Sequence, residues 1–256
     1  MAKFSLTFLH KKCIAPQTFI VLFKSDSSDT AAEFAPGQFA TLEVEPGQRR
    51  SYSFVGITTT TPSYFSETFD DLTGTNQRYF IFLISTKSGG VASKLIDAIE
   101  PGVILPAMSP FGKFKLSDNT SSTKNFICTG TGLAPFIPMI QKARADDATV
   151  QINLFFGTSA DVGDFSHDFF ADMATDKHFA IYTGMFPVQV ETETEFVKNA
   201  TVTQIFPTVA NKYGEMSSQE FYLCGNPFMI ADVKKLLEEN NVTSIFSENY
   251  GPAVKK

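Results

Sequence analysis

The sequence contains few of the residues that most often bind metals or form cross-links. Its 256 residues include three cysteines, three histidines and no tryptophan. Cys13, Cys128 and Cys224 are odd in number, lie far apart and form no Cys-x-x-Cys pair. This spacing indicates neither a disulfide framework nor a zinc or iron–sulfur site. Because free cysteines fit a reducing compartment, we expect a cytoplasmic protein that binds no metal.

Positive charge and long apolar runs are scarce as well. Lys and Arg number 21 against 27 Asp and Glu, which gives a net charge of -6. Such a chain is a poor candidate for binding nucleic acid, which requires a basic surface. No run approaches the roughly 18 apolar residues of a membrane span, and the N-terminus lacks the pattern of a signal peptide. At about 150 residues per domain, the length predicts one or two domains.

The first 116 residues have the pattern of an antiparallel β-barrel. Short apolar runs are separated by turns such as Pro36-Gly37 and Pro101-Gly102, and many short strands at regular spacing are typical of a barrel. One amphipathic helix around Ser93–Ile99 interrupts them. The polar insertion Thr58–Arg78 has no pattern from which its structure could be predicted. The expected strands are Phe4–Leu9, Thr18–Phe23, Phe39–Val44, Ser51–Val55, Tyr79–Ser85 and Val103–Ala107.

A polar run, residues 117–124, is the expected linker. After it, strands and helices alternate, which predicts an α/β domain with a parallel sheet and helices on both faces. We therefore expect two domains, residues 1–116 and 125–256. The expected strands are Asn125–Thr129, Val150–Gly157, Phe179–Tyr182, Phe221–Cys224 and Ser244–Ser247; the expected helices are Pro135–Arg144, Phe165–Met173 and Pro227–Asn240.

Two turns of the second domain have the same design. Gly130 and Gly132 follow a strand and precede a helix expected from Pro135, while Asn226 and Pro227 suit the cap and first residue of the last helix. Helix N-termini attract phosphate, and the carboxyl ends of strands in open α/β sheets line the ligand crevice. A plain tight turn and a well-capped helix are the alternative explanations. Together the two turns favour a nucleotide site.

Two segments of the first domain also suggest ligand binding. Arg50 and Tyr52 are two residues apart, so on a strand both would lie on one face and could contact a phosphate and a flat ring. Gly89-Gly90 followed by Ser93 as a cap would form an anion-binding helix N-terminus. The alternatives are an exposed strand with a half-buried tyrosine and a turn with an N-cap.

In this order, the segments resemble the ferredoxin–NADP reductase family of flavoproteins, and the resemblance covers essentially the whole chain. Ser109–Phe114 is similar to the Gly-Pro-x-Gly-x-Phe segment that closes the family's barrel, with Ser109 in place of glycine. The other matching segments are Arg50–Ser53, Gly90–Ser93, Gly130–Pro135 and Tyr222–Pro227.

The resemblance implies that the barrel binds FAD. Tyr52 would stack on the isoalloxazine ring, Ser53 would lie beside the flavin N5, and Arg50 would pair with the pyrophosphate. Tyr250 would cover the flavin, unless the residues after it take that place. The residues implied for FAD are Arg50, Tyr52, Ser53, Gly90, Val91, Ala92, Ser93 and Tyr250.

By the same resemblance the α/β domain binds NAD(P)H. Cys224 would lie against the nicotinamide at hydride-transfer distance, and Ser53, Cys224 and Glu248 are the implied catalytic residues. Glu248 would relay a proton; a surface carboxylate is the alternative. The residues implied for the dinucleotide are Gly130, Thr131, Gly132, Leu133, Thr158, Ser159, Cys224, Gly225, Asn226, Pro227 and Met229.

The sequence departs from the pattern of NADP-selective members, in which arginines contact the 2′-phosphate of the coenzyme. None of the four arginines follows Arg144, the corresponding position holds Thr158-Ser159, and residues 191–195 are acidic. The sequence therefore favours NADH or use of both coenzymes.

The main functional hypothesis is a monomeric FAD enzyme that moves electrons between NAD(P)H and a one-electron carrier such as ferredoxin or flavodoxin. Alternatives are the reductase component of an oxygenase system, a flavin or ferric reductase, or a subunit without activity. No cysteine cluster for a [2Fe–2S] centre is present, so such a centre would belong to another chain. Four lysines could form a local basic patch for an acidic carrier: Lys87, Lys94, Lys113 and Lys115.

Overall fold

The computed structural model describes residues 2–25, 34–58, 78–119, 121–186 and 197–250. The chain divides into two compact units. The first comprises Met1–Lys115 with Ile137–Met139, and the second comprises Leu116–Phe136 with Ile140–Lys256. Most of the insertion after Thr58, the acidic residues 191–195 and the tail after Tyr250 lie outside the described residues.

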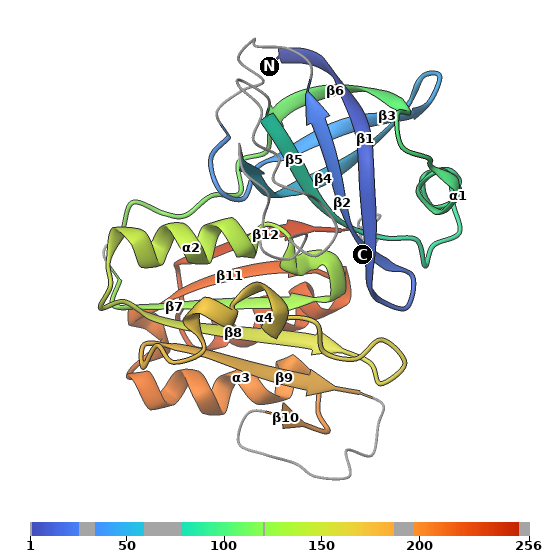
Figure 1. The fold of residues 1–256 in the computed structure, drawn as a ribbon. Coiled ribbons are helices and arrows are strands. Elements are labelled where there is room, and N and C mark those ends of the chain that lie inside the picture. The colour runs from blue at the N-terminus through green and yellow to red at the C-terminus, as the bar shows by residue number, and fades with distance from the viewer. Residues whose placement is uncertain (1, 26–33, 59–77, 120, 187–196, 251–256) are drawn as a thin grey trace. The chain divides into compact units, whose positions relative to one another are not determined.

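The first unit is built on a closed six-stranded antiparallel barrel, as the sequence predicts (Figure 1). Aromatic side chains fill its core. Phe23, Phe54 and Phe82 are fully buried, and the Phe82 ring centroid lies 5.9 Å from that of Phe23 and 5.6 Å from that of Phe54. Such ring pairs add to the stabilisation that burial provides. In their order around the barrel, the strands are β1 (Ala2–Ala15), β2 (Thr18–Ser25), β5 (Arg78–Ser85), β4 (Gln48–Thr58), β3 (Phe39–Glu45) and β6 (Ile104–Phe111).

The first unit also contains the predicted helix, α1 (Val91–Ala98). It begins after Gly90, the N-cap, so Ser93 lies buried inside the first turn. The prediction that Ser93 caps the helix was wrong, because the extended backbone of Gly90 already provides a cap that needs no side chain. The Ser93 hydroxyl instead lies 2.9 Å from the hydroxyl of Ser88.

The second unit contains a six-stranded parallel sheet, which confirms the predicted α/β class. The strands β8 and β7 lie at its centre. The chain proceeds outward from β7 through β8, β9 and β10, and then returns to β11 on the other side of β7 (Figure 1). The strands in order are β10 (Val197–Lys198), β9 (Phe179–Met185), β8 (Gln151–Thr158), β7 (Thr123–Thr129), β11 (Glu220–Gly225) and β12 (Ile245–Asn249).

Helices cover both faces of this sheet, as predicted. Side chains alternate between the faces of a strand. Ile127 belongs to a core cluster with Phe206 of α3 and Val233 of α4. Its neighbour Phe126 points to the other face, where its ring lies 5.1 Å from that of Phe136 of α2. The helices are α2 (Phe136–Asp146), α3 (Val202–Ala210) and α4 (Pro227–Glu239).

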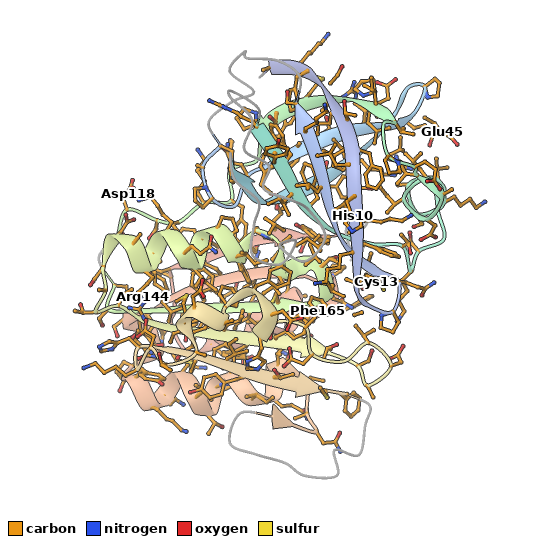
Figure 2. All side chains as sticks on the ribbon, in the orientation of Figure 1. His10, Cys13, Glu45, Asp118, Arg144 and Phe165 are labelled. Atoms are coloured by element: carbon orange, nitrogen blue, oxygen red, sulfur yellow. The ribbon has the colours of Figure 1, made fainter. Side chains whose placement is uncertain are left out.

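The segment Phe165–Met173 is not the predicted helix. It forms two 3₁₀ turns, His167–Phe169 and Ala171–Met173. Phe165, labelled in Figure 2, packs on Phe156 at a ring separation of 4.9 Å. Phe170 packs on Phe179 at 5.2 Å. Residues five apart on an α-helix point roughly 140° away from each other. A regular helix could therefore not bury both rings against the sheet.

The helix α3 and the short strand β10 were not predicted. Pro207 lies inside α3 and hides the helical pattern, since proline normally ends a helix. A usable signal was present: Thr201 and Gln204 form a capping box, in which the Thr201 backbone N–H donates to Gln204 Oε1 at 2.9 Å.

The polar run 117–124 is hydrogen-bonded into the second unit, and its last two residues belong to β7. The Ser117 hydroxyl donates to Glu220 Oε1 at 2.9 Å, and Lys124 Nζ lies 2.6 Å from Glu220 Oε2. The Tyr222 hydroxyl also donates to this carboxylate at 2.6 Å. Burial raises the pKa of Tyr222, and the Glu220 carboxylate adds to the effect. A buried network replaces the loose connection that the composition suggests.

Candidate functional site

The barrel strand β4 carries three of the residues predicted to bind FAD. Tyr52 is partly buried, with its ring 6.2 Å from that of Phe82. Burial raises the pKa of Tyr52 to about 12, and the nearby positive charge of Arg50 opposes that rise. The interaction agrees with the expectation that both side chains lie on one face of the strand. Arg50 is exposed and donates to the carbonyl of Arg49 at 2.8 Å, whereas Ser53 is buried.

The turn between β5 and α1 concentrates polar groups. Gly90, the N-cap, has no side chain that could accept hydrogen bonds from the first N–H groups of α1. The first turn, Val91-Ala92-Ser93, contains no acidic residue. The hydroxyl of Thr86, at the start of the turn, is buried without a hydrogen-bond partner among the described residues. Among the described residues, the N-terminus of α1 therefore has no side-chain cap and no carboxylate in its first turn, an arrangement that suits an anion.

The other end of α1 is fastened to the barrel by Lys11 of β1. Lys11 Nζ donates to the carbonyls of Ile96 and Asp97, each at 2.6 Å. It also lies 5.7 Å from the ring centroid of Phe19. A cation at a helix C-terminus is favourable because the last carbonyls carry partial negative charge. Lys11 was not predicted, because nothing in the sequence indicates that β1 contacts residues more than eighty positions away.

In the second unit, the two predicted glycine turns meet at the carboxyl ends of β7 and β11. A Cβ at Gly132 would lie 2.5 Å from the carbonyl oxygen of Cys224, and one at Gly225 would lie 2.6 Å from Thr129 Oγ1. Asn226 N donates to that same Thr129 hydroxyl at 2.9 Å. Both glycines are therefore needed for the turns to interlock. These strands are also where the sheet order reverses, the usual ligand position in open α/β sheets.

Gly130 differs from the other two glycines. Its φ of +53° lies in the left-handed region, and a Cβ there would meet none of the described atoms within 4 Å. The turn Gly130–Leu133 is a separate 3₁₀ turn, and α2 begins only at Phe136, with Pro135 as its N-cap. The expectation that α2 starts at Pro135 is therefore right to within one residue.

The turn after β11 is capped as predicted. Asn226 is the N-cap of α4, its Oδ1 accepts from Phe228 N at 2.8 Å, and Pro227 is the first helical residue. The side chain of Phe228 is 66% exposed, whereas Met229 is buried in the core cluster beneath the helix. Met229 therefore packs the helix onto the sheet in this structure.

Two of the implied catalytic residues lie side by side, Cys224 on β11 and Glu248 on β12, and Tyr250 follows directly after β12. Glu248 is the register partner of Cys224, and Tyr250 N donates to the carbonyl of Gly225 at 3.0 Å. Cys224 is fully buried, and burial, followed by the charge of Glu248, raises the pKa of its thiol. The thiol is therefore neutral at pH 7 and unsuited to act as a thiolate nucleophile. Burial likewise raises the pKa of Cys128.

The carboxyl ends of β8 and β9 are joined by Asp164, which sequence reasoning missed. Thr183 Oγ1 donates to Asp164 Oδ2, and Ser166 donates from its backbone N–H and hydroxyl to Oδ1 at 2.8 and 2.7 Å. Thr158, predicted to lie near the coenzyme, donates its hydroxyl to the carbonyl of Gly163 at 2.8 Å. The Asp-x-Ser spacing is the only sequence signal for this turn.

The four lysines of the expected carrier patch are exposed on the first unit. None of the described helices is long and apolar enough to cross a membrane.

Comparison with known proteins identifies the second unit. Residues 126–235 match the sequence family described as "Oxidoreductase NAD-binding domain". The reductase component of propane 2-monooxygenase from Rhodococcus jostii (strain RHA1) is 27% identical over 215 residues, covering 81% of this chain and 52% of that protein. The electron transfer component of anthranilate 1,2-dioxygenase from Acinetobacter baylyi (strain ATCC 33305 / BD413 / ADP1) is 25% identical over 236 residues, covering 85% and 58%. The chain thus spans about half the length of the curated relatives that it matches.

Solved structures share the fold over nearly the whole chain. The Amycolatopsis cytochrome P450 reductase GcoB superposes with a TM-score of 0.76 at 22% identity, over 98% of this chain and 70% of that one. A ferredoxin NADP+ reductase from Neisseria gonorrhoeae, solved with bound FAD and NADP, gives a TM-score of 0.71 at 18% identity, over 97% and 99%. Residues 126–235 therefore resemble an oxidoreductase NAD-binding domain, and the chain as a whole shares the fold of the Amycolatopsis reductase and of the Neisseria ferredoxin NADP+ reductase.

Proposed function

We propose that this chain is an FAD-dependent oxidoreductase that takes a hydride from NAD(P)H and passes electrons to a one-electron protein carrier. The observation that carries the proposal is the pair of interlocked glycine turns at the reversal point of the sheet, within a domain of the NAD-binding family. Flavin supplies the chemistry that converts a two-electron hydride into single electrons, and the protein supplies binding and orientation.

In this proposal the barrel holds FAD. The N–H groups at the N-terminus of α1, in the segment Gly90-Val91-Ala92-Ser93, bind its pyrophosphate, and the exposed guanidinium of Arg50 adds a cationic contact. Tyr52 supplies a flat apolar face, and its raised pKa keeps the phenol neutral at pH 7. From the family resemblance, the Ser53 hydroxyl would lie beside the flavin N5. The Tyr250 ring would cover the flavin.

The dinucleotide site lies in the second unit. The open backbone at Gly130 lets phosphate approach the main chain, while Gly132 and Gly225 hold the turn in place. Thr131 and Leu133 complete this turn, and Gly225 and Pro227 shape the neighbouring turn. Thr158 and Ser159 lie where the ribose of the coenzyme would bind. Cys224, with a neutral thiol, offers the nicotinamide a small apolar neighbour, and Glu248 beside it is the candidate for moving a proton.

The electron acceptor is the part of the proposal that depends on the relatives. Ferredoxin or flavodoxin is the first candidate, and the exposed lysines of the first unit would favour an acidic carrier. A second candidate is an oxygenase component, because the relatives include reductase and electron transfer components of propane 2-monooxygenase and anthranilate 1,2-dioxygenase.

A visible spectrum of the purified full chain, expressed with ample riboflavin, tests the proposal directly. We expect flavin absorption that is bleached by NADH under anaerobic conditions and restored by an oxidised ferredoxin. A colourless protein that takes up no FAD would contradict the flavin assignment. A yellow protein that neither NADH nor NADPH reduces would contradict the dinucleotide assignment. Reduction by NAD(P)H without transfer to any carrier would contradict only the acceptor.

A further inference from the structure

The carboxylate of Asp164 occupies the carboxyl edge of the parallel sheet, and the proposed function leaves it without a role. It accepts from Thr183 at the end of β9 and twice from Ser166, so it fastens the loop after β8 to the neighbouring strand. Its side chain nevertheless remains 13% exposed. Asp164 is therefore both rigidly placed and within reach of a ligand at this edge.

The same loop contains the residues assigned to the ribose end of the coenzyme. The Thr158 hydroxyl donates to the carbonyl of Gly163, the residue before Asp164, at 2.8 Å. Gly163 N in turn donates to the carbonyl of Ser159 at 2.8 Å, and its φ is +77°. Thr158, Ser159 and Asp164 thus belong to one tight turn, so a ribose placed against Thr158 and Ser159 would lie close to the carboxylate.

The carboxylate retains room for one more donor. An ionised carboxylate offers about four acceptor positions, and the two Ser166 donors and the Thr183 hydroxyl occupy three. The fourth is on Oδ2, which has one hydrogen-bond donor among the described residues, and His167 Nε2 lies 3.5 Å from this oxygen. Carboxylates at this edge of dinucleotide-binding sheets characteristically accept a ribose hydroxyl.

The charges around this edge do not favour a phosphate. Burial raises the pKa of Cys128 on β7, and repulsion by the negative charge of Asp164 raises it further. The field of the carboxylate therefore acts on groups at the neighbouring strands. The sequence has no arginine after Arg144, and Arg144 itself pairs with Asp176 at 2.7 Å. Among the described residues, His167 is the ion-pair partner of Asp164, with its Nε2 3.5 Å from Asp164 Oδ2.

We propose that Asp164 determines the coenzyme preference: it accepts the 2′-hydroxyl of NADH and repels the 2′-phosphate of NADPH. The inference rests on the proposed dinucleotide site and adds the group that discriminates between the two coenzymes. A single like charge at about 7 Å in a partly exposed site is sufficient for roughly a tenfold effect or more.

Calorimetric titration of the full chain with 5′-AMP and with 2′,5′-ADP tests the inference, because the two nucleotides differ only in the 2′-phosphate. We expect wild type to prefer 5′-AMP, and Asp164→Asn to reduce that preference about tenfold, chiefly through tighter binding of 2′,5′-ADP. The ratio of kcat/KM for NADPH to that for NADH should rise by a similar factor.

The matched control is Asp168→Asn, which removes the same charge from an exposed residue in the adjacent 3₁₀ turn. We expect this variant to leave the preference within twofold of wild type. An equal effect of both variants, or no effect of Asp164→Asn, would overturn the inference while leaving NADH-dependent flavin reduction intact. Wild type that binds neither nucleotide and is reduced by neither coenzyme would instead overturn the proposed dinucleotide site.

If Asp164→Asn does not fold, the wild-type chain still provides a test. Salt screens a partly buried charge such as Asp164 less than an exposed one, so raising NaCl from 0.05 to about 0.5 M should weaken the discrimination against 2′,5′-ADP about twofold. Discrimination that does not change with salt would contradict a repulsive carboxylate.

Discussion

At the scale of single residues, glycines and buried polar groups decide what the site can accept. Gly132 and Gly225 are sterically required, because a Cβ at either position would collide with the backbone or hydroxyl of the opposite turn. Gly130 is required only for its backbone conformation and leaves open space. Of these three positions, Gly130 is therefore the one where a side chain can be introduced to test phosphate binding.

Gly130→Asp should weaken the binding of the dinucleotide, whereas Gly130→Asn should weaken it less. Asp and Asn both tolerate a positive φ better than other residues with a side chain, and they are nearly isosteric. The carboxylate would repel phosphate, so we expect KM for NADH to rise at least tenfold more in the Asp variant. The flavin spectrum of both variants is the control. Equal KM values in the two variants would show that no phosphate approaches Gly130.

The pKa of Tyr52 predicts a loss of stability at high pH. Its folded value of about 12 lies above the ordinary value of 10.0. The neutral phenol is thus favoured in the folded state, and this stability is present below pH 10 and declines as the pH rises toward 12. We expect wild type to lose about 1 kcal/mol of unfolding free energy by pH 11 relative to Tyr52→Phe. Denaturant unfolding at pH 8 and pH 11 measures this, and equal pH dependence in both proteins would refute it.

Glu248 offers a test of proton movement. Its backbone is paired in register with that of Cys224, so its carboxylate is placed beside the predicted nicotinamide site. If Glu248 relays a proton, Glu248→Gln should lower turnover at least tenfold and alter the pH profile of kcat, while KM for NADH changes little. Unchanged turnover and an unchanged pH profile would leave Glu248 as a surface carboxylate.

At the scale of elements, both proposed cofactor segments depend on contacts between parts of the chain that are distant in sequence. Helix α1 has no side-chain cap at its N-terminus and is fastened at its C-terminus by Lys11 from β1. The loop after β8 is fastened to β9 by Asp164 in a similar way. Elements with few internal restraints are positioned by such contacts, since short helices are marginally stable on their own.

Lys11→Met should therefore impair FAD binding through the position of α1. The variant keeps the apolar part of the side chain near Phe19 but loses both bonds to the helix carbonyls. We expect the Kd for FAD to rise about fivefold, with partial recovery in Lys11→Arg, because a net hydrogen bond to a charged group is worth about 1.5 to 3 kcal/mol. Lys12→Met on the same strand is the control. Equal loss in both variants would point to a general charge effect.

At the scale of the whole molecule, a net charge of -6 opposes the docking of an acidic carrier. A local basic surface would have to overcome it. Lys87 and Lys94 are exposed on either side of the proposed pyrophosphate turn, which makes the first unit the expected docking surface.

The Lys87→Glu/Lys94→Glu double variant should raise KM for ferredoxin about fivefold or more at low salt, and the difference should shrink at high salt because the charges are screened. Lys235→Glu, an exposed lysine of α4, is the control in the second unit. Reduction of a small acceptor such as ferricyanide should stay unchanged in every variant. Carrier reduction that is insensitive to salt and to these substitutions would contradict the patch.

The sequence by itself determined the architecture, and it predicted which segments carry the candidate sites. Strand patterns and turn residues are local signals, so the barrel, the parallel sheet and the caps at Asn226 and Pro227 could be predicted. The helix predicted over Phe165–Met173 was wrong and α3 was missed, because burial of Phe165 and Phe170 and the tolerance of Pro207 depend on tertiary contacts. Tertiary structure alone decided that Thr129 locks the two glycine turns, that Lys11 holds α1, and that Asp164 reaches Thr183. Each of these joins side chains to partners on other elements, and no local pattern specifies such a partner.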